Sequence, residues 1–453
     1  MKKKKSAIKN RQVNPTRIIA VTFAAIILLG TVLLSLPAAS RTGQSHGFLT
    51  ALFTATSSTC VTGLVMGDTW SMWSGLGQTV ILCLIEIGGL GFMSAASLVV
   101  FVFRRKVGLR QRMLMAQALS VDDMQSVVKL QKWVLVGSLS IQACGAMILF
   151  FRFLPQFGWA QAAKWGVFHA ISAFCNAGFD IFGSVAPGAS VGAFNTDPVV
   201  CITLMALVFL GGLGFFVWEE VVRVRKFKNF SVYTKLVLIF SVAFLLAGAV
   251  AIMLLEWNNP ATLGDMSTGN KILNSFFQSV TLRTAGFVSF DQAGLTEGGK
   301  AVSLVLMLIG GCSGSTAGGM KVVTFVVLLL FIRSRLQGRS SVTVFKRSIT
   351  QDKVLDAMTI TLVMVVLAMV GAVLICVTSP VAFVDGLFES VSALATVGVT
   401  AGVTEKLTIA GKLLIILYMY FGRVGILTIS LGFLLGDRAE DRFRYANTNL
   451  LIG

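Results

Sequence analysis

Charged side chains are scarce in this sequence of 453 residues, since Asp, Glu, Lys and Arg together make up 13% of it. Soluble globular domains carry about a quarter, so an ordinary soluble enzyme is excluded. Histidine occurs only as His46 and His169, and the seven cysteines are scattered without a Cys-x-x-Cys pair. We therefore expect neither a metal cluster nor a disulfide framework. The chain is instead rich in hydrophobic residues (55%) and in glycine (45 residues). Its mean hydropathy of +0.82 is typical of a polytopic membrane protein.

Eight apolar stretches are long enough to cross a membrane, which takes about 20 residues in a helix. They lie at 18–36, 78–103, 133–154, 199–222, 236–255, 302–332, 357–377 and 413–435. The first follows the basic start MKKKK, as the apolar part of a signal peptide would. Because it has the length of a span and seven more follow, we expect an uncleaved first helix.

The net charge of +18 comes from basic residues that gather in a few segments. Twenty-eight of the 38 Lys and Arg residues lie in 1–17, 104–132, 223–235, 333–353 and 438–444. These are the two termini and the loops after the second, fourth and sixth spans. The positive-inside rule therefore predicts that both termini are cytoplasmic. Since this rule explains the charge, we expect no nucleic-acid partner.

A short segment recurs in each of the four loops predicted to face outward. The copies are FTATSSTCVTG at 53–63, FHAISAFCNAG at 168–178, FFQSVTLRTAG at 276–286 and FESVSALATVG at 388–398. Each has an aromatic residue ten positions before a glycine, and the glycines are 115, 108 and 112 residues apart. This fixed spacing indicates an internal repeat.

A glycine motif recurs in the span after each segment. It reads GGLGF at 88–92 and 211–215, with weaker copies at 310–314 and 422–426. Such glycines also occur where helices merely pack closely. Together with the loop segments, however, they predict one unit of span, short helix, glycine turn and span that is used four times.

Irregular backbone at membrane depth occurs only where it is buried in protein or lines a cavity. Glycine permits the turn, because it tolerates a positive φ. Four such segments around one axis would form rings of carbonyl oxygens, which replace the hydration shell of a monovalent cation. The sequence therefore predicts an all-α polytopic membrane protein. Its eight transmembrane helices would form four helix–pore helix–helix repeats around a pseudo-fourfold pore.

The predicted domains follow from these repeats. They are the N-terminus 1–17, the repeats 18–103, 133–222, 236–332 and 357–435, the cytoplasmic loops 104–132, 223–235 and 333–356, and the C-terminus 436–453.

The sixth span is too long for one helix. Its 33 residues from 301 to 333 would make a helix of about 50 Å, and its middle, GGCSGSTAGG at 310–319, has the composition of a flexible loop. We expect a loop at 310–321 that lies in the membrane and lines the pore. A phosphate-binding loop is excluded, because Gly319-Met320-Lys321-Val322 lacks the required Gly-Lys-Ser/Thr.

Lys321, Arg423 and Glu86 lie within apolar stretches. An intramembrane charge is costly unless it is paired or hydrated, so each is a candidate functional residue. For Arg423 two interpretations stay open: a role in gating, or hydrogen bonds to loop carbonyls that only hold the packing. Glu86 could pair with either cation or face polar groups of a neighbouring subunit.

All four predicted repeats contain distinctive motifs, namely the four loop segments, the GGLGF pair, GGCSGSTAGGMK at 310–321 and YFGRVGILT at 420–428. They resemble the potassium-translocating membrane subunits of the bacterial Ktr/Trk/HKT superfamily, most closely the KtrB-like subunits of Ktr-type systems. The resemblance implies K⁺ uptake through a channel-like pore in the bacterial plasma (inner) membrane, with lipid around it. It also implies Na⁺ stimulation, a homodimer, and gating by a cytosolic KtrA-like ring of RCK subunits that binds ATP or ADP. No cofactor is expected in this chain itself.

The resemblance also assigns the site residues. The filter, whose carbonyls would bind K⁺, comprises Thr59, Cys60, Val61, Thr62, Gly63, Phe174, Cys175, Asn176, Ala177, Gly178, Leu282, Arg283, Thr284, Ala285, Gly286, Leu394, Ala395, Thr396, Val397 and Gly398. The gate comprises Gly310, Gly311, Cys312, Ser313, Gly314, Ser315, Thr316, Ala317, Gly318, Gly319, Lys321 and Arg423.

Only Thr396-Val397-Gly398 has the TVG core of potassium-channel filters. We therefore expect looser discrimination between ions than in a fully symmetric filter. Arg283 lies inside the third segment, where a side chain facing the axis would repel cations. We expect it to point away and to hydrogen-bond backbone carbonyls.

Two other functional classes agree less well with the sequence. An ion-coupled secondary transporter of another monovalent cation would have inverted repeats, with related loops on opposite sides of the membrane. Here all four loops are predicted on the side opposite the basic segments. A membrane enzyme would need a base, a nucleophile or a metal set, and the sequence offers no candidate for these.

Overall fold

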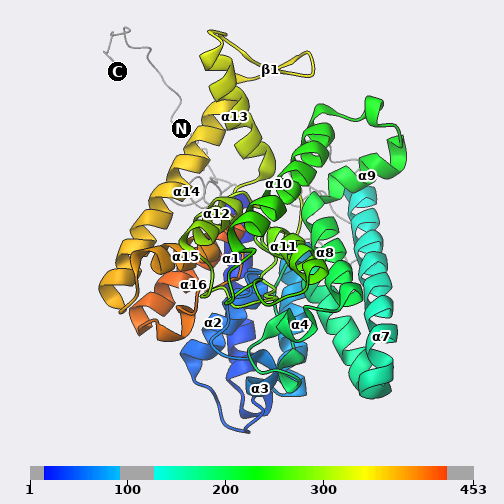
Figure 1. Cartoon of the computed structure of the whole chain (residues 1–453), viewed down its shortest axis with the longest axis vertical. Helices are drawn as coiled ribbons and strands as arrows, with labels where there is room; N and C mark the ends of the chain where they lie inside the picture. The colour runs from blue at the N-terminus through cyan, green and yellow to red at the C-terminus, as the bar shows by residue number, and fades with distance from the viewer. Residues whose placement is uncertain (1–14, 92–126, 426–453) are drawn as a thin grey trace, which may run out of the picture.

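The computed structural model describes residues 15–91 and 127–425, most of them helical (Figure 1). The α-helices are α1 (Pro15–Ser35), α2 (Phe48–Thr59), α3 (Thr69–Met72), α4 (Gly75–Leu90), α7 (Val127–Phe174), α8 (Pro198–Leu213), α9 (Phe215–Val224), α10 (Val232–Glu256), α11 (Thr268–Thr281), α12 (Glu297–Leu308), α13 (Val322–Leu336), α14 (Gln351–Thr378), α15 (Phe383–Leu394) and α16 (Ile409–Val424). Short 3₁₀ helices lie at η1 (Pro37–Ala39), η2 (Phe182–Ser184), η3 (Ser190–Phe194), η4 (Phe227–Asn229) and η5 (Thr404–Lys406).

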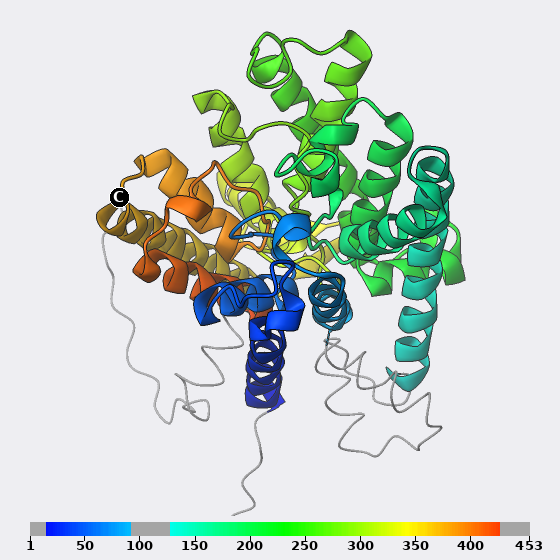
Figure 2. The same cartoon turned by 90° about the horizontal axis from the view of Figure 1, so that it is seen from below.

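The same order of elements recurs along the described chain. A long helix is followed by a short helix whose C-terminal half is buried, then by a turn and another helix. The short helices are α2, α11, α15 and the last part of α7, which Gly158 (φ 74, ψ 172) separates from the first part. Seen from below, the four successive parts of the chain surround a common centre (Figure 2).

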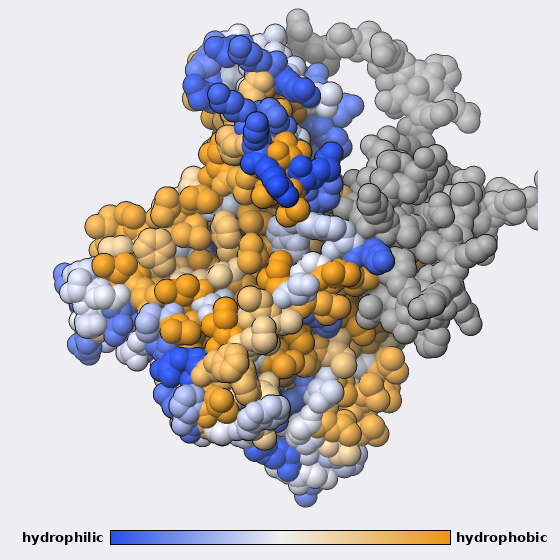
Figure 3. All heavy atoms as spheres, turned by 90° about the vertical axis from the view of Figure 1, so that its right-hand side faces the viewer, coloured by the Kyte–Doolittle hydropathy of each residue, from blue (hydrophilic) through white to orange (hydrophobic). Residues whose placement is uncertain are grey.

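Four of the predicted spans are confirmed as helices long and apolar enough to cross a membrane. These helices cover Arg17–Ser35, Gln131–Phe174, Val232–Glu256 and Gln351–Thr378. The predicted spans 78–103 and 413–435 begin as α4 and α16 and extend beyond the described residues. One side of the molecule shows a broad apolar band between two more polar ends (Figure 3), as expected of a surface that lipid chains cover.

The predicted span at 199–222 is a bent pair of helices, because α8 and α9 meet at an angle of 92° and pass as a span only together. Gly214 lies at this bend with φ 91 and ψ 140. The next amide, that of Phe215, donates a hydrogen bond to the carbonyl of Gly314 (2.8 Å). A Cβ on Gly214 would lie only 2.8 Å from the carbonyl oxygen of Ser313. The segment between α12 and α13 therefore packs directly against the bend.

The same position of the glycine motif ends two other helices. Gly91 and Gly425 cap α4 and α16 with φ values of 82° and 93°. An L side chain is strained at such φ values, so this third motif glycine serves as a helix stop. The sequence alone predicted continuous spans here.

The break predicted in the sixth span is confirmed, since α12 ends at Leu308 and α13 begins at Val322. The predicted all-α class agrees with the mostly helical structure, which contains one small β-hairpin. After α13, strands β1 (Val342–Val344) and β2 (Arg347–Ile349) form an antiparallel hairpin in which Val342 pairs with Ile349. Its two turn residues, Phe345 and Lys346, have φ values of 46° and 64°. Glycine or asparagine usually occupies these positions, so the sequence carried no turn signal.

The last described helix returns to the first part of the chain. Helix α16 packs against α2 and α1, and the hydroxyl of Tyr420 donates to the carbonyl of Ala20 (2.7 Å). The four parts therefore close into a ring within one chain.

Candidate functional site

The four turns after the short helices share one backbone conformation. Two positions before each glycine, the residue has a positive φ, and so does the glycine. The pairs are Val61 and Gly63 (56° and 98°), Asn176 and Gly178 (58° and 69°), Thr284 and Gly286 (68° and 83°), and Thr396 and Gly398 (52° and 90°). Positive φ is unusual for non-glycine residues, above all for β-branched ones such as Val and Thr. Strain of this kind persists where the surroundings enforce it and clusters at functional sites.

The four glycines meet at one place, which we call the glycine ring. A Cβ on Gly63 would lie 2.7 Å from the carbonyl oxygen of Ala177, in the second turn. One on Gly178 would lie 2.6 Å from the Cα of Gly286, in the third turn. A Cβ on Gly286 would lie 2.9 Å from the carbonyl oxygen of Val397, in the fourth turn.

The fourth turn closes the ring onto the first. A Cβ on Gly398 would collide with the carbonyl oxygen of Thr62 and lie 2.9 Å from the Cα of Gly63. Each turn thus touches the next one, and only glycine fits at all four positions. The predicted convergence of the four segments agrees with this geometry.

A hydroxyl group on each short helix braces the turn that follows. The hydroxyl oxygens of Ser57 and Ser392 accept hydrogen bonds from the amides of Gly63 and Gly398, each at 3.1 Å. Those of Ser172 and Thr281 donate to the carbonyls of Phe179 and Phe287, each at 2.6 Å. The sequence analysis did not predict these hydrogen bonds, although Ser57, Ser172 and Ser392 all lie six positions before the glycine of their turn.

The short helices end directly before the turns, so their C-terminal ends point toward the ring. This end of a helix carries a partial negative charge, which favours a cation nearby. Thr59, Phe174 and Leu394, predicted as the first filter residues of their segments, are still the last residues of these helices. The irregular backbone of those three segments begins one residue later than predicted.

In three of the four parts, the first glycine of the motif explains why the second helix approaches the ring closely. A Cβ on Gly88, Gly211 or Gly422 would collide with the carbonyl group of Thr59, Phe174 or Leu394, respectively. The first glycine of the motif therefore allows a helix to pack closely against the C-terminal end of a short helix.

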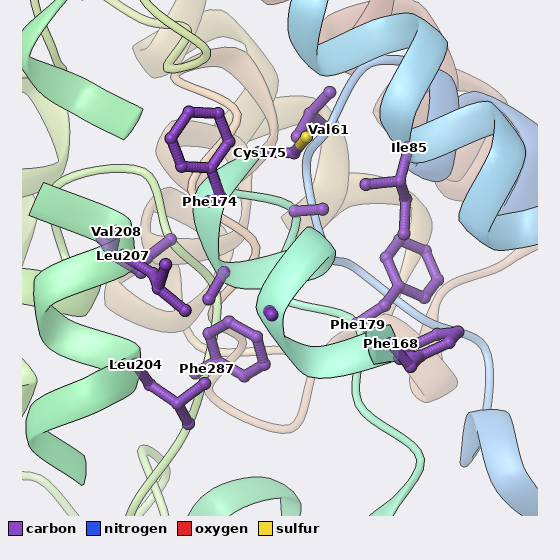
Figure 4. Packing of buried hydrophobic residues seen from close by; sticks show 14 of the residues in the cluster. Val61, Ile85, Phe168, Phe174, Cys175, Phe179, Leu204, Leu207, Val208 and Phe287 are labelled. Atoms are coloured by element: carbon purple, nitrogen blue, oxygen red, sulfur yellow. The ribbon is translucent and has the colours of Figure 1, made fainter. Parts of the chain in front are cut away.

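The side chains behind the ring pack into a hydrophobic cluster. Val61, Phe174, Cys175 and Phe287 come from three of the turns and share this cluster with Ile85 of α4 and Leu204, Leu207 and Val208 of α8 (Figure 4). Such packing holds the strained turns in place.

Arg283 points away from the ring, as predicted. Its guanidinium group donates to the carbonyl oxygen of Ser241 in α10 at 2.9 Å and to the Ser241 hydroxyl at 3.4 Å. The positive charge is thereby held behind the third turn.

The segment 309–321 lies against the turns on the side of the C-terminal ends of the short helices. The hydroxyl of Thr316 lies 3.1 Å from the carbonyl oxygen of Phe174 and 3.3 Å from the side-chain oxygen of Asn176. A Cβ on Gly319 would lie 3.0 Å from the carbonyl oxygen of Ala395. The segment thus touches both the second and the fourth turn.

The two cations of the predicted gate both donate to carbonyls of this segment. The ammonium group of Lys321 donates to Ala317 at 2.8 Å and to Gly318 at 3.4 Å. The guanidinium of Arg423 donates to the carbonyl of Thr316 and, at 3.0 Å, to that of Gly89 in α4. Arg423 therefore ties the segment to the first part of the chain.

Glu86 forms no ion pair with Lys321 or Arg423 within the described part of the chain. Its carboxylate accepts hydrogen bonds from the amide of Gln142 in α7 (3.0 Å) and from the thiol of Cys175 (3.3 Å). Glu86 thus supports the second turn from behind. No spacing rule in the sequence brings these three residues together.

Comparison with known proteins agrees with this geometry. Residues 1–439 match the TrkH family, described as cation transport protein. The chain is 39% identical to the potassium/sodium uptake protein NtpJ of Enterococcus hirae over 98% of both chains. It is 38% identical to the Ktr system potassium uptake protein B of Bacillus subtilis over 99% of both.

A solved structure shows the same fold. The potassium transporter TrkH from Vibrio parahaemolyticus superposes with a TM-score of 0.73, at 16% identity, over 95% of this chain and 86% of that one. These relatives are transport proteins and not enzymes, as the sequence predicted for this chain. Together with its apolar helices, they make the chain a multi-pass membrane protein. The chain belongs to the TrkH family of cation transport proteins.

Proposed function

We propose that this protein takes up K⁺ through a channel-like pore at the glycine ring. The observation that carries the proposal is the repeated strained turn, which appears four times and closes on itself. Backbone carbonyls in such turns can replace the water around a monovalent cation. The names of the relatives, which are potassium uptake proteins, support K⁺ as the ion.

The pore would be built from eight transmembrane helices in four repeats, with both termini in the cytoplasm of a bacterial cell. The predicted spans 78–103 and 413–435 would begin with α4 and α16 and go on beyond the glycines that cap these helices. The bent pair α8 and α9 and the broken pair α12 and α13 would each count as one span. The basic segments 223–235 and 333–353 support this orientation.

The segment 309–321 would act as the gate. It lies against the second and fourth turns, and Lys321 and Arg423 hold it there through its own carbonyls. A polar loop in a conduction path obstructs ions sterically, and a nearby cation adds an electrostatic barrier.

Partners belong to the same proposal. We expect a homodimer and a cytosolic RCK ring that binds ATP or ADP, with Na⁺ as an activator. A relative named as a component of a Ktr system supports a partner subunit. A relative named for both potassium and sodium uptake supports a role for Na⁺.

Ion flux into lipid vesicles tests the proposal. The purified protein should pass K⁺ and Rb⁺ faster than Na⁺. Replacing Gly286 by Ser places a side chain where the turns converge, so the K⁺/Na⁺ permeability ratio should fall by about tenfold, equivalent to about 1.4 kcal/mol.

Gly43→Ser is the matched control. Gly43 also has a positive φ, but no atom of the described residues lies within 4 Å of a Cβ there. If both variants had the permeability ratio of the unmodified protein, the glycine ring would not be the filter. An ion-coupled secondary transporter would instead move K⁺ against its own gradient when a second ion drives it.

A further inference from the structure

A cavity of about 600 Å³ lies on the side of the glycine ring opposite the segment 309–321. Gly63, Gly178, Gly286 and Gly398 all contribute to its wall, and the rest comes from the loops that follow the turns. The segment 309–321 touches residues before the glycines, whereas the cavity is lined by residues after them. An ion that enters the ring from this side must pass through the cavity.

The charged residues that line this cavity are all acidic. Asp68, Asp180, Asp291 and Glu405 line it, and none of its described lining residues is Lys or Arg. The whole chain carries a net charge of +18. The acidic lining is therefore a local feature, and a cleft with charges of one sign concentrates ions of the other.

Two of the carboxylates are held beside each other by backbone contacts. Asp68 caps α3 by accepting from the amide of Ser71 (2.7 Å), and it packs against the backbone of Gly183. Asp180 accepts from the amide of Phe182 (3.2 Å), one residue before Gly183. Burial, followed by the nearby charge of Asp68, raises the pKa of Asp180 to about 6, although hydrogen bonds from Ser190 and the Phe182 amide oppose this. A bound cation would relieve both effects.

A second, independent observation points to a ligand. Ser289 lines the same cavity and is fully buried, but its hydroxyl has no hydrogen-bond partner among the described residues. Ser190, which hydrogen-bonds Asp180, also accepts from the amide of Val288, the neighbour of Ser289 (3.4 Å). A buried hydroxyl without a partner costs free energy. The oxygen of Ser289 has lone pairs that could accept a hydrogen bond from the water of an ion or contact the ion itself.

We propose that this cavity contains a docking site for a partly hydrated monovalent cation, bound by the carboxylates of Asp180 and Asp68 with the hydroxyls of Ser190 and Ser289. The site holds the ion before it loses its remaining water at the glycine ring. The described residues contain no group of three or more His, Cys, Asp or Glu placed to hold a metal ion. Two carboxylates with hydroxyls suit weak monovalent binding better than a Ca²⁺ site, which takes six to eight oxygens.

This inference rests on the proposed function, because it places the site in the path of the transported ion. Asp180→Asn removes the charge and keeps the size of the side chain. K⁺ uptake into vesicles at low ionic strength should show a KM about three- to tenfold higher, with the maximal rate retained, since one charge acts across a few ångströms of partly aqueous space. Ser289→Ala should raise KM about twofold without changing the charge.

Asp291→Asn is the matched control, because Asp291 lines the same cavity and its side chain accepts from the amide of Ala293. Equal KM values in all variants would overturn the site. The site would also be overturned if Asp180→Asn and Asp291→Asn raised KM equally and added salt abolished both increases. Such a result would mean that the carboxylates act only through their summed negative potential. Ser289→Ala keeps the test valid if Asp180→Asn does not fold.

A binding measurement separates this proposal from the proposed function. The thermal unfolding midpoint is followed while K⁺ replaces choline at constant ionic strength. K⁺ should raise the midpoint of the unmodified protein more than that of Asp180→Asn. If this difference appears while the unmodified protein carries no K⁺, the docking site holds and the transport function fails. If K⁺ is carried but the two proteins respond equally, the docking site is wrong.

Discussion

At the scale of single residues, the strained positions of the ring explain the choice of amino acid. Val61, Thr284 and Thr396 have positive φ values although they are β-branched. A residue of this kind would rarely adopt the conformation alone. The buried helix ends, the hydroxyl braces and the hydrophobic cluster behind the turns enforce it. The carbonyl directions that a pore needs are therefore set by the surroundings of the turns and not by local preference.

Glu86 is the residue whose role the structure changes most. We predict that Glu86→Ala loosens the second turn, because Gln142 and Cys175 lose their acceptor. A buried donor left without a partner costs about 1–3 kcal/mol. The thermal midpoint should fall and the K⁺/Na⁺ permeability ratio should decrease.

Two further variants sharpen this prediction. Glu86→Gln retains an acceptor oxygen and should stay close to the unmodified protein. Cys83→Ala changes an exposed residue of the same helix and should have no effect. If Glu86→Ala kept its permeability ratio while losing stability, Glu86 would only hold α4 and α7 together.

At the scale of elements, the spacing of aromatic and glycine residues predicted the four turns. Each turn follows a buried helix and needs a glycine, which can adopt a positive φ. The composition of 310–319 likewise predicted the broken span. The bend at Gly214 could not be predicted, since a glycine in an apolar run is equally compatible with a straight helix. Its cause is the backbone of Ser313 and Gly314, about a hundred residues later in the chain.

The segment 309–321 has a base that its own backbone hydrogen bonds close and a tip that packs against other elements. The amide of Gly310 donates to the carbonyl of Met320 (2.8 Å), and that of Val322 donates to Gly311 (3.0 Å). These bonds close the base without any residue of 312–317. The contacts with the second turn come from Thr316, which lies within this tip.

Deleting residues within 312–317 should therefore raise K⁺ flux and reduce its dependence on a regulator, while the permeability ratio is retained. Arg423→Ala should act in the same direction but more weakly, because it removes only the bonds to Thr316, Gly88 and Gly89. Tyr418→Phe on the same helix removes a bond to Leu367, within the fourth part of the chain, and serves as the control. A folded deletion variant with lower or fully regulator-dependent flux would show that the segment is structural packing.

At the scale of the whole molecule, contacts between the parts keep the ring closed. Glu86 with Gln142 joins the first and second parts, Lys300 with Asp385 (2.8 Å) joins the third and fourth, and Tyr420 with Ala20 joins the fourth and first. One chain can therefore hold four different turns in one ring. The turns differ in sequence, and the segment 309–321 contacts the second and the fourth of them.

Two basic segments lie together at one end of the molecule. The ammonium group of Lys235 lies 5.9 Å from the centre of the Phe345 ring, so the loop 223–235 adjoins the β1–β2 hairpin. The hairpin region carries Arg339, Lys346 and Arg347. The hairpin lies at the end of α13, whereas α3, whose Thr69 lines the cavity at the glycine ring, lies at the opposite end of the molecule (Figure 1). Either an acidic surface of a cytosolic regulator or anionic lipid would suit its charge.

Charge-reversal variants distinguish a cytosolic regulator from anionic lipid as the partner of this surface. We predict that Arg339→Glu, Lys346→Glu and Arg347→Glu, made together, weaken co-purification of the RCK ring, because three favourable charge pairs become repulsive. The effect should shrink at high salt, since exposed charges more than about 10 Å apart are screened at 0.1 M. Lys406→Glu is the control and should leave binding unchanged. Lys406 is an exposed lysine in η5, next to Glu405, which lines the cavity at the glycine ring. If the triple variant still bound the ring but lost binding to vesicles that contain anionic lipid, the surface would be a lipid contact, and the regulator would have to dock elsewhere on the cytoplasmic side.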